Sequence, residues 1–530
     1  MSFPLLTVTA AVPAVGAVLT AAVPAARRTA AKWLALLFSL ATLALAVLVA
    51  VRFEPGGARY QLTESHAWIA DFGVRYQLGV DGIGVALIAL TALLIPFVIG
   101  AGWHDADPLE TSSSRWRPTQ GFFALILLVE AMVIISFEAT DVFLFYIFFE
   151  AMLIPMYFLI GGFGDRAHAG TDENAAAQRS YAAVKFLLYN LVGGLIMLAA
   201  VIGLYVVAGN FSLQEIAAAR AAGTLDMSTN TERLLFLGFF FAFAVKAPLW
   251  PLHTWLSNAM GESTAPVAVL ITAVVDKVGT FAMLRFCLGL FPDAGKWATP
   301  VILVLALISI VYGALVAVGQ RDIKRLVAYA SISHFGFIIM GIFAMTSQGQ
   351  SGATLYMVNH GLSTAALMLV AGFLISRRGS RLIADYGGVQ KVAPVLAGTF
   401  LIGGLATLSL PGLAPFVSEF LVLVGTFARY PVIGIVATIG IVLAALYTLV
   451  LYQRTMTGPV KEEVRTMKDL RLREVLVVAP LIALLIALGV YPKPLTEIVN
   501  PAVEHTMSDV HQKDPKPEVA VEAKNGEAAK

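Results

Sequence analysis

The sequence predicts an all-α polytopic membrane protein with about fourteen transmembrane helices of about 20 residues each. Three observations support this fold class. Of the 530 residues, 58% are hydrophobic and 13% are charged, whereas an ordinary soluble domain has roughly 25% charged residues. Apolar runs long enough to cross a bilayer follow one another along the chain. Lys and Arg number twenty in the odd-numbered loops and seven in the even-numbered loops, which places the odd loops in the cytoplasm and both termini outside.

The expected spans divide the chain into five parts. Residues 1–119 hold three helices and an outer hairpin loop, and the first helix is retained because no basic leader precedes it. Residues 120–290 and 291–453 form two units of five helices, 454–504 form a basic cytoplasmic loop and the last helix, and 505–530 form a polar, disordered tail. We expect spans near 5–24, 32–51, 80–102, 120–138, 140–160, 180–208, 234–258, 263–290, 299–318, 324–345, 351–376, 394–427, 430–453 and 473–491.

Two segments are predicted to fold outside the bilayer. Residues 52–79 alternate polar with apolar side chains around Gly56 and Gly57, a pattern that suits a short hairpin. Ser212 and Glu215 have the spacing of a capping box, which predicts a short surface helix on the outer side.

Two of the apolar runs, the seventh and the twelfth, contain helix breakers. In 234–258 two prolines follow Lys246, and in 394–427 the stretch PGLAP precedes Glu419. Broken backbone is tolerated at membrane depth only where it is buried in protein or lines a water-filled cavity. Because five helices separate the two breaks, they predict an internal, inverted repeat of two five-helix units with a working site near the midplane.

Carboxylates occur inside the fourth and fifth spans, where Glu130 and Glu150 are surrounded by apolar residues. A charged side chain at the centre of a span costs about 2.5 to 3.5 kcal/mol on insertion scales, so it almost always faces the bundle interior and a partner. We therefore expect a cation beside Glu150. A helix–helix hydrogen bond from a protonated Glu is the alternative.

Basic and imidazole side chains occur in further spans. Lys185 lies a turn or two inside the membrane, so snorkelling to the interface competes with a functional role. Asp276 and Lys277 adjoin at mid-span and point about 100° apart, so they should meet different neighbours. His334 and His360 lie in successive helices among Ser, Thr and Asn residues, and either a proton relay or a satisfied core position explains them.

Buried ionisable residues in eight spans favour an ion or proton path. A nearby carboxylate favours the protonated form of a buried lysine, so movement of Glu150 toward or away from Lys246 would make the lysine hold or release a proton. The chain contains no P-loop and no dinucleotide fingerprint, so that movement must be driven from elsewhere.

Other classes of function are disfavoured. The net charge of +2 does not point to a nucleic-acid partner. The single cysteine, Cys287, can form neither an internal disulfide nor a cysteine-held iron–sulfur cluster. We expect no metal site, and haem ligation by His334 and His360 is disfavoured because further histidine pairs are missing.

Five segments resemble signature segments of one family and occur in the family's order over residues 120–430. They are FFEAMLIPMYFLI, FAFAVKAPLWPLHTWL, DKVGTFAMLRF, RLVAYASISHFGFI and LPGLAPFVSEFLVL. The family is that of the antiporter-like membrane subunits of respiratory complex I, the proton-pumping NADH:quinone oxidoreductase. The chain most resembles its M-type branch, chain 4, because Glu419 stands where the L and N branches and the related sodium/proton antiporter subunits usually have lysine.

The resemblance implies a fold of fourteen helices with two inverted five-helix repeats, and a role for each matching residue. Glu150 and Lys246 would form a charge pair in the first unit, with Glu130, Lys185 and Asp276 as further possible members of the path. The implied proton path continues through a central relay at Lys277, then His334 and His360, and ends at Glu419.

The resemblance also implies a setting. This subunit would bind no cofactor, and NADH, FMN, iron–sulfur clusters and quinone would belong to the whole complex. Its partners would be other complex I subunits, especially homologous antiporter-like subunits on either side, with membrane lipid and protons and without nucleic acid. The expected location is the bacterial plasma membrane.

Two departures and two rival functions stay open. Ser257–Met260 stands where the family commonly has Pro-Asp-Ala-His, which leaves the proton uptake route in doubt, and Asp276 replaces an apolar residue of many relatives. The rivals are a subunit of a multi-subunit sodium/proton antiporter, and a scaffold whose buried charges only lock helix pairs.

Overall fold

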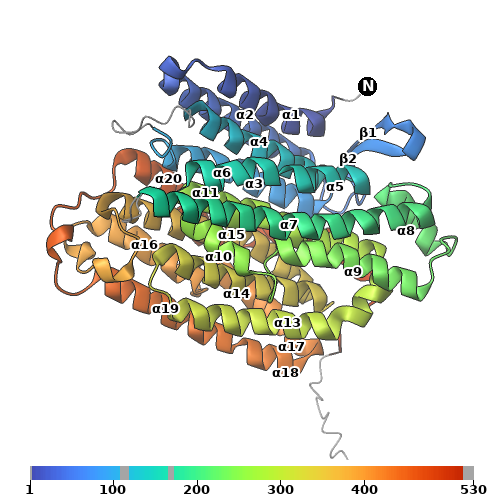
Figure 1. The fold of residues 1–530 in the computed structure, drawn as a ribbon. Helices are drawn as coiled ribbons and strands as arrows, with labels where there is room; N and C mark the ends of the chain where they lie inside the picture. The colour runs from blue at the N-terminus through green and yellow to red at the C-terminus, as the bar shows by residue number, and fades with distance from the viewer. Residues whose placement is uncertain (1–2, 108–118, 165–171, 517–530) are drawn as a thin grey trace, which may run out of the picture.

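The computed structural model describes residues 3–107, 119–164 and 172–516. These residues form one bundle of helices that run roughly parallel or antiparallel to one another, with a single two-stranded sheet at one end (Figure 1). Twelve helices in the described part are long and apolar enough to cross a membrane. The predicted all-α polytopic membrane fold is confirmed.

The N-terminal part contains the expected hairpin, but its turn lies elsewhere than predicted. Its elements are α1 (Leu5–Ala22), α2 (Arg28–Arg52), β1 (Gln61–Ile69), β2 (Val74–Val80) and α3 (Gly82–Ala101). The strands pair antiparallel and turn at 70–73, where Gly73 has a φ of 66°. The prediction of a turn at Gly56 and Gly57 is wrong because these glycines make a separate turn before β1, in which Gly57 N donates to Glu54 O.

Two groups of helices follow, and their bounds are these. The first group is α4 (Thr119–Glu138), α5 (Val142–Ala151), α6 (Leu153–Phe163), α7 (Asp172–Ala208), α8 (Leu213–Ala221), α9 (Thr229–Lys246), α10 (Thr254–Glu262), α11 (Ala265–Val269), the π-helical η3 (Leu270–Val275), α12 (Asp276–Ala282) and the π-helical η4 (Met283–Leu288). The second is α13 (Pro292–Val318), α14 (Ile323–Phe343), α15 (Ser347–Arg378), α16 (Pro394–Thr407), α17 (Ala414–Arg429), α18 (Pro431–Ala437) and α19 (Ile439–Met456).

Both predicted helix breaks are present. The backbone leaves the helix between α9 and α10, and again between α16 and α17. These two interrupted pairs are additional to the twelve candidate spans. The total of fourteen spans and the inverted repeat stay predictions.

The predicted surface helix after Ser212 is confirmed. Helix α8 begins at Leu213, and the Ser212 hydroxyl accepts a hydrogen bond from the backbone N–H of Glu215. It lies at the same end of the bundle as the hairpin (Figure 1), where Arg75 of β2 and Glu215 form an ion pair at 3.7 Å.

The C-terminal part contains one helix, α21, that was not predicted from the sequence. After α20 (Leu472–Val490), helix α21 (Lys493–Asp509) extends into the segment expected to be disordered from residue 505 onward, so that boundary is wrong. Its buried residues repeat at helical spacing: Val499, Ala502, Val503, Thr506 and Met507. The rest of the expected tail, from 517, lies outside the described residues.

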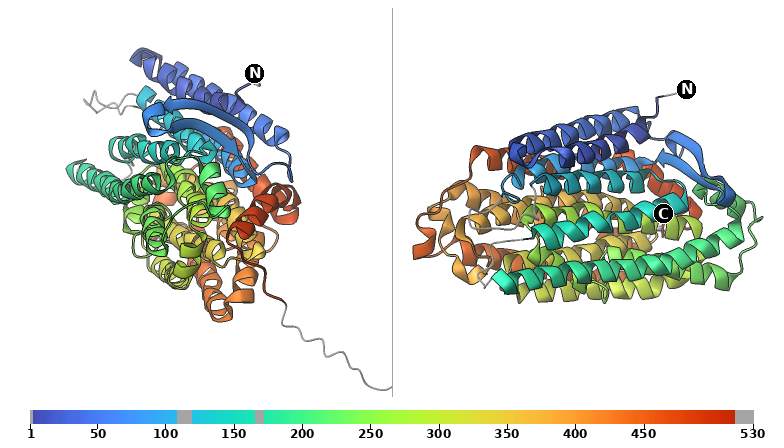
Figure 2. Two further views of the ribbon diagram at one scale, coloured as in Figure 1. Left: turned by 90° about the vertical axis from the view of Figure 1, so that its right-hand side faces the viewer. Right: turned by 45° about the horizontal axis from the view of Figure 1, so that its top comes forward.

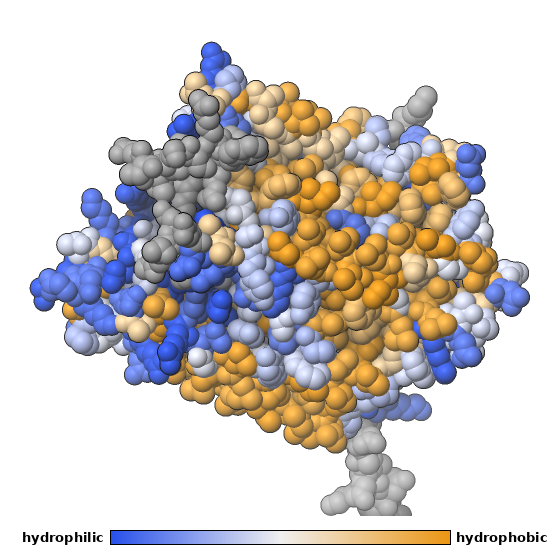
Figure 3. Space-filling view, in the orientation of Figure 1, coloured by the Kyte–Doolittle hydropathy of each residue, from blue (hydrophilic) through white to orange (hydrophobic). Residues whose placement is uncertain are grey.

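Some helices are enclosed in the centre of the bundle, whereas others form its hydrophobic outer surface. The continuous helix from α11 to η4 is buried throughout, and α14 and α15 are almost as completely enclosed. Helices α1 and α2 lie along one side of the bundle (Figure 2). Hydrophobic side chains cover the middle of the face in Figure 3, and hydrophilic ones gather toward its ends. The ionisable residues inside this bundle are therefore surrounded by protein.

Candidate functional site

Lys246 lies at the first helix break, next to the end of α5. Lys246 is the last residue of α9, and Pro248 and Pro251 keep the backbone non-helical until Thr254. Its side chain is fully buried, Nζ donates to the carbonyl oxygen of Phe149 at 3.1 Å, and the Phe149 ring centre lies 4.2 Å away. Because the last four carbonyls of a helix lack intrahelical partners, the end of α5 offers an acceptor to this buried cation.

Glu150 follows directly after that carbonyl. Among the described residues, Glu150 and Lys246 make no ion pair within 4.0 Å, and Glu150 Oε1 is buried without a hydrogen-bond partner. The predicted pair is therefore placed on adjoining parts of α5 and α9 but is not in direct contact. A modest movement of either end would change the separation of the two charges.

Asp276 and Lys277 lie at the start of α12, between the two π-helical segments. Both side chains are fully buried. Lys277 Nζ lies 2.6 Å from His360 Nδ1 and 4.2 Å from the centre of the Phe335 ring. Both carboxylate oxygens of Asp276 lack a hydrogen-bond partner in the described part of the chain. As expected from their angular separation, the two residues do not share a partner.

A row of polar side chains continues from Lys277 through the second unit. The rings of His360 and His334 lie 5.2 Å apart at 84°, and His334 Nε2 is 3.4 Å from the Tyr447 hydroxyl. The Tyr356 ring lies 5.8 Å from that of His334. The Tyr356 hydroxyl donates to Glu419 Oε2 at 3.0 Å. The row therefore joins α12, α15, α14 and α17.

Glu419 lies just after the second break and has two hydroxyl donors. Ser409, in the non-helical stretch between α16 and α17, donates to the same oxygen as Tyr356. Nearby, Asn359 Nδ2 donates to the carbonyl oxygen of Ala414, the first residue of α17. The break thus brings side-chain and backbone polar groups together around one buried carboxylate.

Sequence reasoning missed several members of this arrangement. Tyr356 precedes His360 by four residues, so helical spacing alone could have placed both on one face. Tyr447 and Ser409 gave no signal because single hydroxyls are common in membrane helices. Arg285, omitted from the buried ionisable residues, forms an ion pair with Asp81 at 2.9 Å.

Two predicted residues lie outside the row. Glu130 is fully buried in α4, and neither carboxylate oxygen has a hydrogen-bond partner among the described residues. Lys185 Nζ donates to Asn258 Oδ1 at 3.0 Å and lies 5.8 Å from the ring centres of Tyr181 and Tyr189. Asn258 belongs to the stretch 257–260, which differs from the Pro-Asp-Ala-His common in the family, so this difference gives Lys185 a neutral partner.

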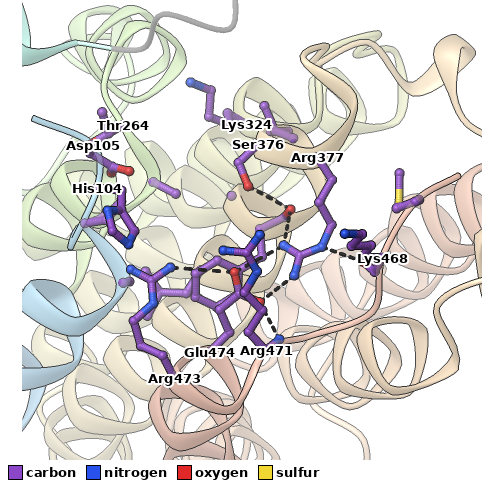
Figure 4. A pocket seen from close by; sticks show the side chains of 18 of the residues that line it. His104, Asp105, Thr264, Lys324, Ser376, Arg377, Lys468, Arg471, Arg473 and Glu474 are labelled. Atoms are coloured by element: carbon purple, nitrogen blue, oxygen red, sulfur yellow. Dashed lines mark hydrogen bonds and ion pairs between the residues drawn. The ribbon is translucent and has the colours of Figure 1, made fainter. Parts of the chain in front are cut away.

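A polar cavity of about 790 Å³ is lined by the segment before α20 and the end of α15 (Figure 4), and that segment lies at the end of the bundle opposite the hairpin (Figure 1). Arg377, Arg471, Arg473 and Glu474 converge on it, and Arg377 pairs with Glu474. Thr264, which directly precedes α11, also lines it. Lys277 lies thirteen residues further along the continuous helix from α11 to η4, a separation of at most about 20 Å at 1.5 Å per residue. We refer to this cavity as the polar mouth; it lies at the start of the continuous helix that carries Lys277.

The described residues contain no group of three or more His, Cys, Asp or Glu side chains placed to hold a metal ion. Cys287 is a buried free thiol, as expected for a small apolar residue.

Comparison with known proteins assigns this bundle to a family. The sequence pattern described as NADH:quinone oxidoreductase/Mrp antiporter, TM, matches residues 139–444. The chain belongs to this family. Within the NADH:quinone oxidoreductase/Mrp antiporter family, it is 57% identical to NADH-quinone oxidoreductase subunit M of Mycobacterium tuberculosis over 98% of this chain and 96% of that protein. It is 38% identical to subunit M of Rhodobacter capsulatus over 92% of each chain.

Solved structures of the family share the fold. The structure of respiratory complex I from Thermus thermophilus with bound NADH contains a chain with a TM-score of 0.83 and 30% identity, covering 96% of this chain and all of that one. A chain of the Mrp complex from Dietzia has a TM-score of 0.81 at 20% identity, covering 97% of this chain and all of that one, and shows the fold alone. The resemblance drawn from the five sequence segments is confirmed.

Proposed function

We propose that this chain is a membrane-arm subunit of an NADH:quinone oxidoreductase and moves protons along the buried row from Lys277 to Glu419. The observation that carries the proposal is a row of buried polar side chains in the otherwise apolar bundle. Lys277 contacts His360 at 2.6 Å, the rings of His360, His334 and Tyr356 follow at 5.2 and 5.8 Å, and the Tyr356 hydroxyl donates to Glu419. Ionisable residues inside a membrane are costly, and such a succession is typical of a proton relay. The names of the relatives that are 57% and 38% identical support the enzyme.

The gate in this proposal is the pair of Glu150 and Lys246. An approaching carboxylate favours the protonated form of a buried lysine, and its withdrawal favours proton release. Lys246 is held by the Phe149 carbonyl without contacting Glu150 directly, so a small shift between α5 and α9 changes the interaction. Asp276 directly precedes Lys277 in α12, and α12 packs against α9, which ends at Lys246, so this contact connects the gate to the central row.

The energy for that shift comes from quinone reduction in other subunits. No cofactor binds to this chain in the proposed function; NADH, FMN, iron–sulfur clusters and quinone belong to the rest of the complex. Homologous antiporter-like subunits flank it in a bacterial plasma membrane, with the odd loops in the cytoplasm and both termini outside. The polar mouth near Thr264 would then face the cytoplasm and supply protons.

The test is proton uptake into inverted membrane vesicles driven by NADH, measured at equal abundance of the complex. Lys246→Ala and Glu419→Gln should remove uptake and slow NADH oxidation. Lys493→Ala and Glu497→Gln are matched controls, because both side chains are more than half exposed at the start of α21. Normal uptake in both path variants would refute the proposal.

The same vesicles distinguish the rival functions. Transport that needs sodium and proceeds without an electron donor would identify a sodium/proton antiporter subunit. Normal uptake after joint replacement of Glu150 and Lys246 by apolar residues of similar size would identify a scaffold, since buried ion pairs can often be replaced in this way.

A further inference from the structure

The carboxylate of Glu150 lies directly against the backbone of α7 at Gly194. A Cβ atom added at Gly194 would lie 2.0 Å from Glu150 Oε1 and 2.4 Å from Oε2, far inside the 3.4 Å of ordinary contact. Both residues belong to the tightly packed region between α5 and α7, and Gly194 is buried. Only glycine at position 194 leaves the Glu150 side chain where it is.

The preceding glycine fixes α7 against the helix that carries Lys246. A Cβ added at Gly193 would lie 3.2 Å from Ala242 Cα and 3.6 Å from Val245 Cβ, and Val245 directly precedes Lys246. Helix α7 therefore contacts both members of the gate. Gly193 packs against α9 beside Lys246, and Gly194 packs against the Glu150 carboxylate.

We propose that Gly194 is a positioning residue that sets the place of the Glu150 carboxylate relative to Lys246. The inference rests on the proposed function of that pair. An alanine at position 194 would move Oε1 by at least about 1.4 Å, the difference between 2.0 and 3.4 Å. The obstructed atoms are the far end of a flexible side chain and not backbone, so the fold accommodates the change while the carboxylate moves. Alanine is also the better helix former, so helix propensity does not oppose the substitution.

The experiment measures NADH-driven proton uptake by vesicles that contain the whole complex with Gly194→Ala. We expect uptake to fall about ten-fold, because an error of about 1 Å in a proton-transfer geometry has large effects on rate. Gly162→Ala in α6 is the matched control, since a Cβ there meets nothing within 4 Å. Equal uptake by Gly194→Ala and wild type would overturn the inference.

A second arm separates positioning from general damage to packing. Glu150→Asp shortens the side chain by one methylene and withdraws the carboxylate from position 194, so adding Gly194→Ala to Glu150→Asp should cause little further loss. The pH profile of uptake should shift in Gly194→Ala alone. The same fractional loss in both backgrounds, or a loss that is uniform at every pH, would refute positioning.

Glu150→Gln distinguishes this inference from the proposed function. If Glu150→Gln pumps normally, the gate itself is wrong. If Glu150→Gln abolishes uptake while Gly194→Ala does not change it, the gate stands and only the role of Gly194 fails.

Discussion

Removal of the Tyr356 hydroxyl tests whether Glu419 is joined to the histidines by a specific contact. The hydroxyl donates to Glu419 Oε2 at 3.0 Å in a fully enclosed position. Tyr356→Phe keeps the ring and so preserves its packing against His334 and Phe337, whose centres lie 5.8 and 6.4 Å away. Only one polar atom is lost, and Ser409 remains as the second donor.

The expected magnitude follows from the worth of that hydrogen bond. A hydrogen bond to a charged group contributes about 1.5 to 3 kcal/mol. Since 1.4 kcal/mol is a factor of ten, Tyr356→Phe should lower proton uptake about 10- to 100-fold. The loss should approach that of Glu419→Gln without reducing the abundance of the complex.

The assay is NADH-driven uptake by inverted vesicles, with electron transfer to an artificial acceptor measured in parallel to count intact complexes. Tyr205→Phe is the control, because the Tyr205 ring stacks on Phe211 at 4.9 Å outside the row. Full uptake by Tyr356→Phe would show that protons reach Glu419 by another route. The row would then end at His334.

Three further outcomes follow from contacts outside the central row. Lys185→Ala removes one hydrogen bond to Asn258, so uptake should fall no more than about ten-fold, and a loss as complete as that of Lys246→Ala would contradict a peripheral role. Arg285→Ala leaves Asp81 and the Phe137 carbonyl without their buried partner. The substitution should lower the free energy of unfolding by about 3 to 5 kcal/mol and lower the melting temperature of the complex in detergent. The exposed control Arg52→Ala should leave the melting temperature unchanged. Burial raises the pKa of the Asp141 carboxyl, just before α5, to about 6 from 3.8, so the folded state binds this proton more tightly than the unfolded state does. Its stabilising effect is complete below about pH 4 and is lost as pH rises through 6, so the melting-temperature difference between wild type and Asp141→Asn should change across that range, and a constant difference would refute the assignment.

The fold was predictable because the bilayer requires long apolar helices and makes prolines inside them conspicuous. Lys246 and Glu419 were recognisable for the same reason: each is an ionisable residue beside a break in an apolar run. The π-helical segments around Asp276 and Lys277 were not predictable, because a one-residue widening of a helix depends on side chains from neighbouring helices and leaves no local pattern.

The candidate site was predictable residue by residue but not as a set of contacts. His334 and His360 belong to successive helices, yet only the packed structure shows that Glu419, on a third helix, accepts hydrogen bonds from the hydroxyls of Tyr356 and Ser409. A tyrosine in an apolar helix is ordinary core composition. Gly194 was equally invisible, since its role depends on a carboxylate from α5 that is 44 positions earlier in the chain.

Each helix interruption lies beside an ionisable residue that is held by a specific polar contact. Lys246 ends α9 and is bound by a carbonyl in the last turn of α5, a group that an intact helix would have used internally. Near Glu419, Asn359 Nδ2 donates to the carbonyl oxygen of Ala414 at the start of α17. Lys246 and Glu419 each have a hydrogen-bond partner, whereas Glu130, in the uninterrupted α4, is buried with neither carboxylate oxygen hydrogen-bonded among the described residues. These contacts offset part of the cost of burial, and a small movement of the helices beside each break can change them.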